Sequence, residues 1–244
     1  MEQGWMTVAD NRPIARNTYR LSLRGNTGAI ARPGQFVNLL LPGLTLRRPI
    51  SVCDWAEDSL TLVYKTVGRG TEQMSRLQPG EQLDVLIGLG NGYDVTKAGD
   101  APLLLGGGVG VPPLFGLARV LREQGKAVTA VLGFNTREEV FLAEEFRALG
   151  CEVVLVTADG SLGERGFVTD WLPADYSYFY TCGPLPMLRA AYRATRTEGQ
   201  LSLEERMGCG FGACMGCSFQ TRNGTKRICR EGPVLEKGEL PWDD

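Results

Sequence analysis

The sequence of 244 residues contains no histidine at all. Without imidazole there can be no Ser-His-Asp triad and no histidine-ligated metal, and no side chain has an ordinary pKa near neutral pH. Excess charge is also missing, because 26 Lys and Arg stand against 28 Asp and Glu, for a net charge of −2. A balanced chain of this kind gives no reason to expect a nucleic-acid partner. Chemistry that needs neither a proton shuttle nor a basic surface, such as electron transfer, loses nothing by these absences.

Long apolar runs are absent too. None approaches the roughly 20 residues that a membrane-spanning helix needs, and the longest, around residues 103–105, passes at once into glycines. The N-terminus is polar and has no apolar core, so it does not resemble a secretory signal peptide. The seven cysteines are an odd number and three of them are scattered, which disfavours disulfides. We therefore expect a cytoplasmic protein, and the 43% of apolar residues are enough for a packed core.

Four cysteines are grouped near the C-terminus. Their spacing is C-x4-C-x2-C with a fourth Cys twelve positions later, which is the ligand spacing of a plant-type [2Fe-2S] site. Four glycines stand among them, and glycine allows the tight turns that aim backbone N–H groups at sulfur. The pattern predicts an iron-sulfur cluster with four thiolate ligands: Cys209, Cys214, Cys217 and Cys229.

Two alternatives remain open for these four cysteines. Zinc also accepts four thiolates, although zinc ribbons usually carry two C-x2-C pairs and this chain has one. Under that reading the protein would be a zinc-stabilised binding module without redox chemistry. Disulfides or unligated thiols are the other alternative.

Residues 1–97 are expected to form an all-β domain. Short β-rich runs recur, and Pro-Gly pairs separate several of them, which is typical of a barrel or sandwich. A short helix is expected over residues 71–77, capped by Thr71. The expected strands are 18–23, 35–41, 59–65 and 82–87.

Two motifs in this domain are candidates for nucleotide binding. In Arg48-Pro49-Ile50-Ser51, the Arg side chain can clamp a pyrophosphate and the Ser hydroxyl can donate to a ring or phosphate oxygen. In Gly68-Arg69-Gly70-Thr71, a glycine turn leads into the expected helix, where free N–H groups favour an anion. Each motif alone also fits an ordinary strand end or helix start. The two motifs together indicate nucleotide binding because an expected nucleotide-binding domain follows them in the sequence.

Strands and helices alternate from residue 98 to about 200, which is the βαβ pattern of a parallel sheet. The expected strands are 103–105, 127–134, 152–157 and 176–181, and the expected helices are 114–123, 138–149 and 186–195.

A glycine loop follows the first of these strands, with glycines at Gly106, Gly107, Gly108 and Gly110. It stands where phosphate-binding loops stand, between a strand and a helix that has proline in its first turn. The loop is not a G-x-G-x-x-G fingerprint, and no acidic residue ends the next strand, at residues 133–137. The choice between NAD and NADP therefore stays open, as does a tight turn without any ligand.

Cys182 lies at the expected end of a late strand, where open α/β sheets hold their ligands. Its small, polarizable side chain can contact a nicotinamide ring there, although a packing role is the alternative. Cys53 and Cys151 are interpreted as packing residues.

Taken together, these motifs resemble those of the ferredoxin-reductase family of flavoproteins. The segments Ser202 to Met207, before the four cysteines, and Cys229 to Val234, at the last one, narrow the resemblance further. They are similar to the electron-transfer subunits of NAD-dependent dihydroorotate dehydrogenases of the B type. The likeness extends over nearly the whole chain, and the cysteine block is its most specific part.

The resemblance implies a ferredoxin-reductase-like fold with three parts. These are an FAD-binding β-barrel (1–97), an NAD-binding α/β parallel-sheet domain (98–200) and a [2Fe-2S] module (201–244). The glycine loop would bind the NAD pyrophosphate, Cys182 would face the nicotinamide, and the four cysteines would bind the cluster. The implied FAD contacts are Arg48, Pro49, Ile50, Ser51, Val63, Tyr64, Lys65, Gly70 and Thr71.

The resemblance also implies a partner, an FMN-containing catalytic subunit that oxidises dihydroorotate in pyrimidine biosynthesis. Electrons would pass from that FMN through the [2Fe-2S] cluster and FAD to NAD⁺, in a heterotetramer with two copies of each subunit. Phe211 and Met215 flank the ligands and are hypothesised to contact the partner, local packing being the alternative. A reductase subunit acting with ferredoxin or a hydrogenase is the nearest competing function.

One segment departs from the family pattern. At residues 87–93 the chain reads Ile-Gly-Leu-Gly-Asn-Gly-Tyr, where a Gly-Pro-Leu-Gly-Asn-Gly-aromatic run is expected. The missing proline affects the expected shape of a loop near the flavin.

Overall fold

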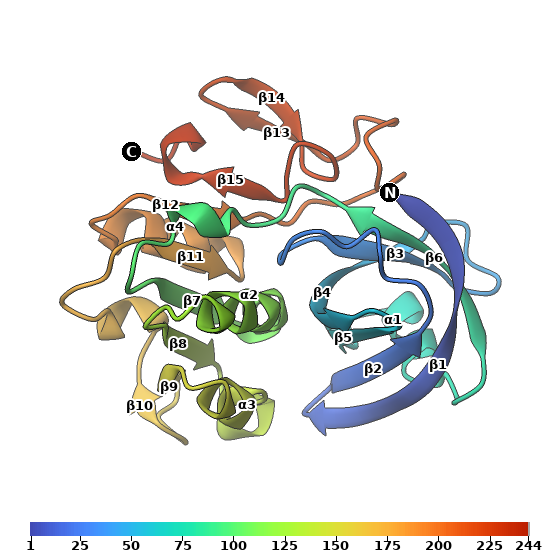
Figure 1. Cartoon of the computed structure of the whole chain (residues 1–244), viewed down its shortest axis with the longest axis horizontal. Coiled ribbons are helices and arrows are strands. Elements are labelled where there is room, and N and C mark those ends of the chain that lie inside the picture. Colours follow the sequence, from blue (N-terminus) through green and yellow to red (C-terminus); the bar gives the residue numbers. More distant parts are fainter. Residues whose placement is uncertain (244) are drawn as a thin grey trace.

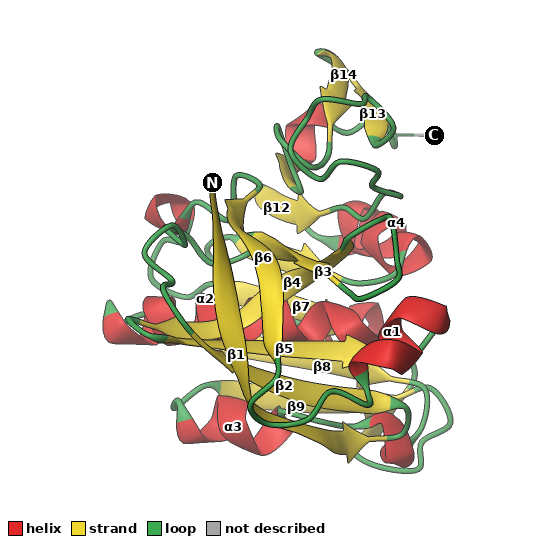
Figure 2. Ribbon diagram, turned by 90° about the vertical axis from the view of Figure 1, so that its right-hand side faces the viewer, coloured by secondary structure: helices red, strands yellow, loops and turns green. Residues whose placement is uncertain are grey.

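The computed structural model describes residues 1–243 and has three parts (Figure 1). A closed antiparallel barrel is followed by a parallel sheet covered by helices on both faces, and a small C-terminal module lies across one end of both (Figures 1 and 2). Within residues 1–243, no helix is both long enough and apolar enough to cross a membrane. The expected fold class is confirmed.

The barrel closes in the order β1-β2-β5-β4-β3-β6. Alternate residues of each strand point inward, so that Leu21 and Leu23 of β2 meet Leu60 and Leu62 of β5 in the interior. The strands are β1 (Glu2–Ala15), β2 (Thr18–Arg24), β3 (Phe36–Leu40), β4 (Arg48–Ala56), β5 (Ser59–Lys65) and β6 (Gln82–Leu89), with helix α1 (Arg69–Met74) between the last two.

The second sheet has the order β10-β9-β8-β7-β11-β12-β15, and all its strands are parallel except β15. Its elements are β7 (Leu103–Gly107), α2 (Val111–Glu123), β8 (Thr129–Phe134), α3 (Ala143–Ala148), β9 (Glu152–Thr157), β10 (Glu164–Arg165), β11 (Phe179–Cys182), α4 (Leu185–Ala194) and β12 (Gly199–Ser202). Short 3-10 turns are η1 (Val95–Lys97), η2 (Gly108–Gly110), η3 (Arg137–Glu139) and η4 (Val168–Trp171).

Successive side chains along each strand face opposite sides of this sheet. Leu104 faces α2 and α3, on the side of the barrel, whereas Leu103 and Leu105 face α4. Buried parallel strands need apolar residues on both sides, which explains the continuous Leu103–Leu105 run.

All four expected helices differ from the structure in their bounds, and for two of them, 114–123 and 186–195, the shift is only one to three residues at an end. The helix expected over residues 71–77 is α1, which begins at Arg69, so Thr71 lies inside its first turn instead of capping it. The helix expected over 138–149 is divided into η3 and the shorter α3, because Leu142 adopts a left-handed φ of 62° between them. A continuous helix cannot pass through that conformation.

The C-terminal module contains the hairpin β13 (Ser218–Thr221) and β14 (Gly224–Arg227), the strand β15 (Val234–Glu236) and the 3-10 turn η5 (Lys237–Glu239). Strand β15 pairs antiparallel with β12 and so joins the edge of the parallel sheet. Glu236 fixes this edge, because its carboxylate accepts hydrogen bonds from Tyr178 Oη (2.8 Å) and Gln200 Nε2 (2.7 Å) and pairs with Lys97 (2.8 Å).

The barrel and the sheet meet through α2, α3 and η3. Helix α2 crosses β4 at Gly116, where a Cβ would lie 2.8 Å from the carbonyl oxygen of Cys53. Ion pairs reinforce the contact, including Arg119 with Asp54 (2.8 Å). The other two pairs are Lys65 with Glu139 (3.1 Å) and Arg20 with Glu145 (2.7 Å).

Candidate functional site

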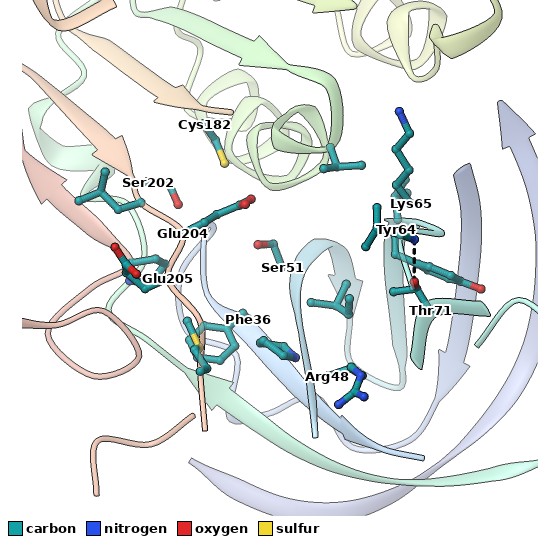
Figure 3. Close-up of a pocket in the computed structure, with 18 residues that line it drawn as sticks. Phe36, Arg48, Ser51, Tyr64, Lys65, Thr71, Cys182, Ser202, Glu204 and Glu205 are labelled. Carbon is teal, nitrogen blue, oxygen red and sulfur yellow. Dashed lines mark hydrogen bonds between the residues drawn. The ribbon is translucent and has the colours of Figure 1, made fainter. Parts of the chain in front are cut away.

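A first cavity, of about 290 Å³, lies where the barrel meets the carboxyl ends of β11 and β12 (Figure 3). Its barrel wall comes from β4 and β5, whose backbones are fixed by sheet pairing. Eight of the residues predicted to contact FAD line this cavity: Arg48, Pro49, Ile50, Ser51, Val63, Tyr64, Lys65 and Thr71. The structure therefore brings the predicted FAD contacts together, and Cys182 joins them from the sheet.

Gly70, the remaining predicted contact, lies beneath the Arg48 side chain. A Cβ at Gly70 would stand only 2.0 Å from Arg48 Nε, so no other residue would allow the guanidinium to lie across the start of α1. Arg48 donates to the carbonyl of Leu46 at 2.6 Å and keeps further N–H groups for a ligand. This cradle of Arg48 over Gly70 fits the pyrophosphate of a dinucleotide.

The hydroxyl of Thr71 is committed to its own turn. It accepts from the backbone N–H groups of Val67 (2.9 Å, dashed in Figure 3) and Gly68 (3.2 Å) and donates to the Gly68 carbonyl (3.0 Å). Thr71 therefore shapes the loop that borders the cavity.

Across the cavity stand Cys182, Ser202 and Glu204, close to Ser51 of the barrel (Figure 3). Burial, followed by the nearby charge of Glu204, raises the pKa of the Cys182 thiol to about 12. Partial removal from water also raises the pKa of Glu204. At neutral pH Cys182 is consequently a neutral thiol, which can pack against a ring but does not act as a base.

The glycine loop separates this cavity from a second one. Val109 points into the first cavity, while Gly107 and Gly108 border the second. Gly110 packs so tightly that a Cβ would lie 2.2 Å from the Cys182 carbonyl oxygen, and a Cβ at Gly106 would lie 2.9 Å from Val111. Only Gly108 of this loop combines a positive φ (52°) with open space, so it is the position where a phosphate can approach the backbone.

The second cavity, of about 420 Å³, crosses the carboxyl ends of β7, β8 and β9. Phe167 lines its mouth and is 68% exposed, which is unusual for so large an apolar side chain. Glu139 is the only charged residue in its lining, and its carboxylate accepts from Asn135 Nδ2 at 2.9 Å. The same carboxylate pairs with Lys65 at 3.1 Å, so a cation stands directly behind this part of the lining.

The four cysteines come together as two pairs. Cys209 donates its backbone N–H to Cys214 Sγ (3.5 Å), and Cys229 donates its own to Cys217 Sγ (3.4 Å). Ala213 N–H also donates to Cys209 Sγ at 3.2 Å. Gly210 and Gly212 both have positive φ, which turns the loop so that these N–H groups face sulfur.

The two pairs differ in environment. Cys217 and Cys229 are each 2% exposed, whereas Cys214 is exposed and Cys209 is half-buried. Burial, and then the hydrogen bond with Cys217, raises the pKa of Cys229 to about 12. Burial alone would raise the pKa of Cys209, but the hydrogen bonds that backbone N–H groups donate to its sulfur have the larger effect. They lower the pKa of this thiol to about 6.

The paired arrangement decides which metal group fits. Within residues 1–243, no three His, Cys, Asp or Glu side chains surround one point closely enough to share a single ion. A tetrahedral zinc site needs four ligands around one ion, whereas each iron of a [2Fe-2S] cluster needs only two thiolates. Two thiol pairs therefore fit the binuclear cluster better than zinc.

Several cavity residues have no counterpart in the sequence predictions. Phe36, Val109, Ser202, Glu204 and Met207 all line the first cavity. Ser202 and Glu204 lie at the carboxyl end of β12, where a parallel sheet presents ligand contacts, but the four-residue β12 is too short to show a pattern.

Comparison with known proteins agrees with this arrangement. Residues 204–241 match the family model described as the iron-sulfur cluster binding domain of dihydroorotate dehydrogenase B. The chain is 44% identical to the "Dihydroorotate dehydrogenase B (NAD(+)), electron transfer subunit" of Geobacillus sp. (strain WCH70), covering 98% of this chain and 99% of that one. It is 43% identical to the protein of the same name from Fusobacterium nucleatum subsp. nucleatum, covering 93% and 94%.

A solved structure is similar over the same length. It is described as that of the NADH-dependent reduced ferredoxin-NADP oxidoreductase, studied for flavin-based electron bifurcation. The TM-score is 0.87 at 29% identity, and the match covers 98% of this chain and 90% of that one.

Proposed function

Since the chain belongs to the family of dihydroorotate dehydrogenase B (NAD(+)) electron transfer subunits, we propose that it carries electrons from a catalytic subunit to NAD⁺. The proposal is supported by two neighbouring cavities and four paired thiols in one chain. We assign the first cavity to FAD and call it the flavin cavity, and we assign the second to the nucleotide. The reaction served would be the oxidation of dihydroorotate in pyrimidine biosynthesis.

Flavin, when bound, supplies the exchange between the two-electron chemistry of nicotinamide and the one-electron chemistry of an iron-sulfur cluster. The chain's own part is to hold and insulate these groups. Arg48 and Gly70 would bind the FAD pyrophosphate, Ser51 and residues 63–65 would border its ring, and the four cysteines would ligate the cluster. No side chain has to move a proton near neutral pH, which agrees with the absence of histidine.

NAD would extend from one cavity into the other. Gly108 would receive the pyrophosphate, Val109 and Cys182 would face the nicotinamide, and Phe167 would lie against the adenine. The support is geometric, because the glycine loop borders both cavities and Phe167 stands at the far mouth of the second. Glu139, which is paired with Lys65, would accept from ribose hydroxyls, and the name of the relatives supports NAD as the dinucleotide.

We divide the chain at residues 97 and 200 into the three units that the sequence predicted. The last barrel strand ends at Leu89 and the first strand of the parallel sheet begins at Leu103, which supports the first boundary. Strand β12 runs through residue 200 and ends at Ser202, and the family match begins at residue 204, which supports a second boundary just after Ser202.

The partner would be an FMN-containing catalytic subunit, in an assembly of two copies of each. Phe211 and Met215 are 43% and 53% exposed beside the thiols, and we assign them to the contact with that subunit. Asp at either position should weaken subunit assembly in size-exclusion chromatography. Unchanged assembly would leave local packing as their role.

The deciding experiment combines a visible spectrum with flavin, iron and sulfide analysis of the anaerobically purified complex. Co-purification with an FMN subunit, and NAD⁺ reduction by dihydroorotate, are expected. Colourless protein without iron would contradict the proposal. The similarity to the ferredoxin-NADP oxidoreductase keeps a ferredoxin-linked reductase as second candidate, and that function predicts ferredoxin-dependent turnover without an FMN partner.

A further inference from the structure

Strand β3 touches both the flavin cavity and the cluster loop. Val37 and Leu39 point into the barrel interior, so the alternate residues Phe36 and Asn38 face outward on one side of the strand. Phe36 lines the flavin cavity and belongs to the same apolar cluster as Cys209, Cys217 and Cys229, while Asn38 lies against the loop of Cys209. Neighbouring positions of a single strand thus meet the two sites.

Asn38 is in direct contact with the first ligand. Its side chain is almost fully buried (1% exposed), and Nδ2 donates to the Cys209 carbonyl at 3.3 Å. Gly210 comes so close that a Cβ there would lie 2.3 Å from Asn38 Nδ2. The loop leaving Cys209 therefore follows the shape of this amide.

The other half of the amide is unsatisfied. Asn38 Oδ1 is buried and has no hydrogen-bond partner among residues 1–243. A buried amide oxygen without a donor costs stability, and Leu would fill nearly the same space without that cost. Such a group in a folded protein needs a reason other than stability.

Asn91 shows what a purely structural amide looks like in this protein. It also joins the barrel side to the C-terminal module, but it donates to the carbonyls of Glu231 (3.1 Å) and Val234 (2.7 Å). Its Oδ1 accepts from Val234 N–H at 3.1 Å. Asn91 is saturated by the segment after the last ligand, whereas Asn38 keeps a free oxygen beside the first.

We propose that Asn38 is a positioning residue, which holds the Cys209 end of the cluster against the wall of the flavin cavity. Hydrogen-bonding groups around ligands orient them and tune the potential of the metal group. Asn38 thereby controls both the potential of the cluster and the rate of electron exchange between cluster and flavin. The inference rests on the proposed function, because it requires a cluster at the four thiols.

The test compares four forms of the complex with its partner: wild type, Asn38→Leu, Asn38→Asp and the control Gln220→Leu. Gln220 is an exposed amide on β13 whose bonds go to Thr221 and Thr225. The readouts are flavin, iron and sulfide content, the EPR spectrum and midpoint potential of the cluster, and its rate of reduction by NADH. Both Asn38 variants should keep FAD, shift the potential and EPR spectrum, and slow cluster reduction by about tenfold.

The melting temperature distinguishes a positioning role of Asn38 from a role in the stability of the fold. Asn38→Leu should melt at or above the wild-type temperature, and loss of iron alone, with FAD and melting temperature kept, also supports the proposal. Wild-type potential, spectrum and rate in Asn38→Leu would overturn it, as would a joint loss of FAD, iron and thermal stability. A wild-type complex without iron would instead contradict the proposed function itself.

Discussion

The flavin cavity and the cluster site are built in opposite ways. Arg48, Ser51 and Lys65 stand on β4 and β5, and the pairing of those strands fixes their positions without any ligand. Three of the four cysteines instead lie between Ser202 and Ser218, a stretch without helix or strand. Gly210, Gly212 and even Met215 have positive φ there.

The difference teaches where each site gets its shape. Sheet hydrogen bonds determine the barrel wall of the flavin cavity, where the predicted FAD contacts lie, whereas Glu204 and Met207 on the opposite wall belong to the stretch that leads into the cysteines. The cluster loop has few backbone constraints of its own, and four bonds to metal would supply the rest. We therefore expect changes at one site to spare the other, and the following predictions test that independence.

The largest effect is expected for Cys214→Ser. Loss of a ligand should remove the cluster and reduce electron transfer from dihydroorotate to NAD⁺ more than about 100-fold, since even changes beyond the ligands cost 10–100-fold. FAD content and the NADH-ferricyanide activity should stay unchanged, because the cavity stands on paired strands. Iron analysis and both assays check this, with Cys151→Ser as the cysteine control. Full iron content in Cys214→Ser would disprove the ligand assignment.

Arg48→Ala should produce the converse pattern. Loss of a charge-assisted contact to the pyrophosphate costs about 1.5–3 kcal/mol, which corresponds to roughly 10- to 150-fold weaker FAD binding. Iron and sulfide should remain. Flavin titration measures the affinity, and the matched control is Arg47→Ala, because Arg47 pairs with Asp84 (2.9 Å) instead of bordering the cavity. Equal FAD loss in both variants would contradict the cradle.

Phe167→Ala tests whether the second cavity binds the adenine through Phe167. Removing a ring stacked on adenine costs about 0.5–1.5 kcal/mol, so KM for NADH should rise up to about tenfold. Nicotinamide mononucleotide has no adenine, so its reduced form should be oxidised with unchanged KM. The idea fails if both substrates are affected alike.

The smallest effect concerns the contact between barrel and sheet. For Glu139, burial acts to raise the pKa, but hydrogen bonds from Lys65 and Asn135 lower it below its ordinary 4.5. The folded state then binds this proton less tightly than the unfolded state, so the stabilisation is present above about pH 4.5 and is lost as pH falls further.

Glu139→Gln should accordingly lower the free energy of unfolding by about 1 kcal/mol at pH 7 and by less near pH 4. Denaturant titrations at the two pH values measure it, with the exposed Glu57→Gln as control. A pH-independent loss would show that the carboxylate charge is not responsible.

Sequence patterns located the strands of the barrel well where they alternate. The run 59–65 coincides with β5, because Leu60 and Leu62 point into the interior on alternate positions. Strand β1 was not predicted, since its apolar residues do not alternate regularly and only two of its 14 residues, Met6 and Val8, are buried. The helix expected over 138–149 was too long because nothing in the local sequence marks Leu142 for a left-handed backbone.

Some residues of the candidate site could likewise be predicted from the sequence, and others could not. Spacing alone predicted the four cysteines as ligands, since the ligands of such a cluster lie close together in the chain. Asn38, Glu204 and Phe167 could not be found this way, because each reaches its site through tertiary packing between distant segments. Their polar or aromatic character has no local pattern to distinguish it from an ordinary surface or core position.

The antiparallel strand β15 has a consequence for how such proteins can be recombined. Because it completes the parallel sheet beside β12 and carries Glu236 into contact with Tyr178 and Lys97, the cysteine-bearing tail is not an exchangeable cassette. A chimera that grafts this tail onto another reductase must also transplant a complementary sheet edge. Without that edge, the donor loses its outermost strand and the recipient acquires an unpaired one.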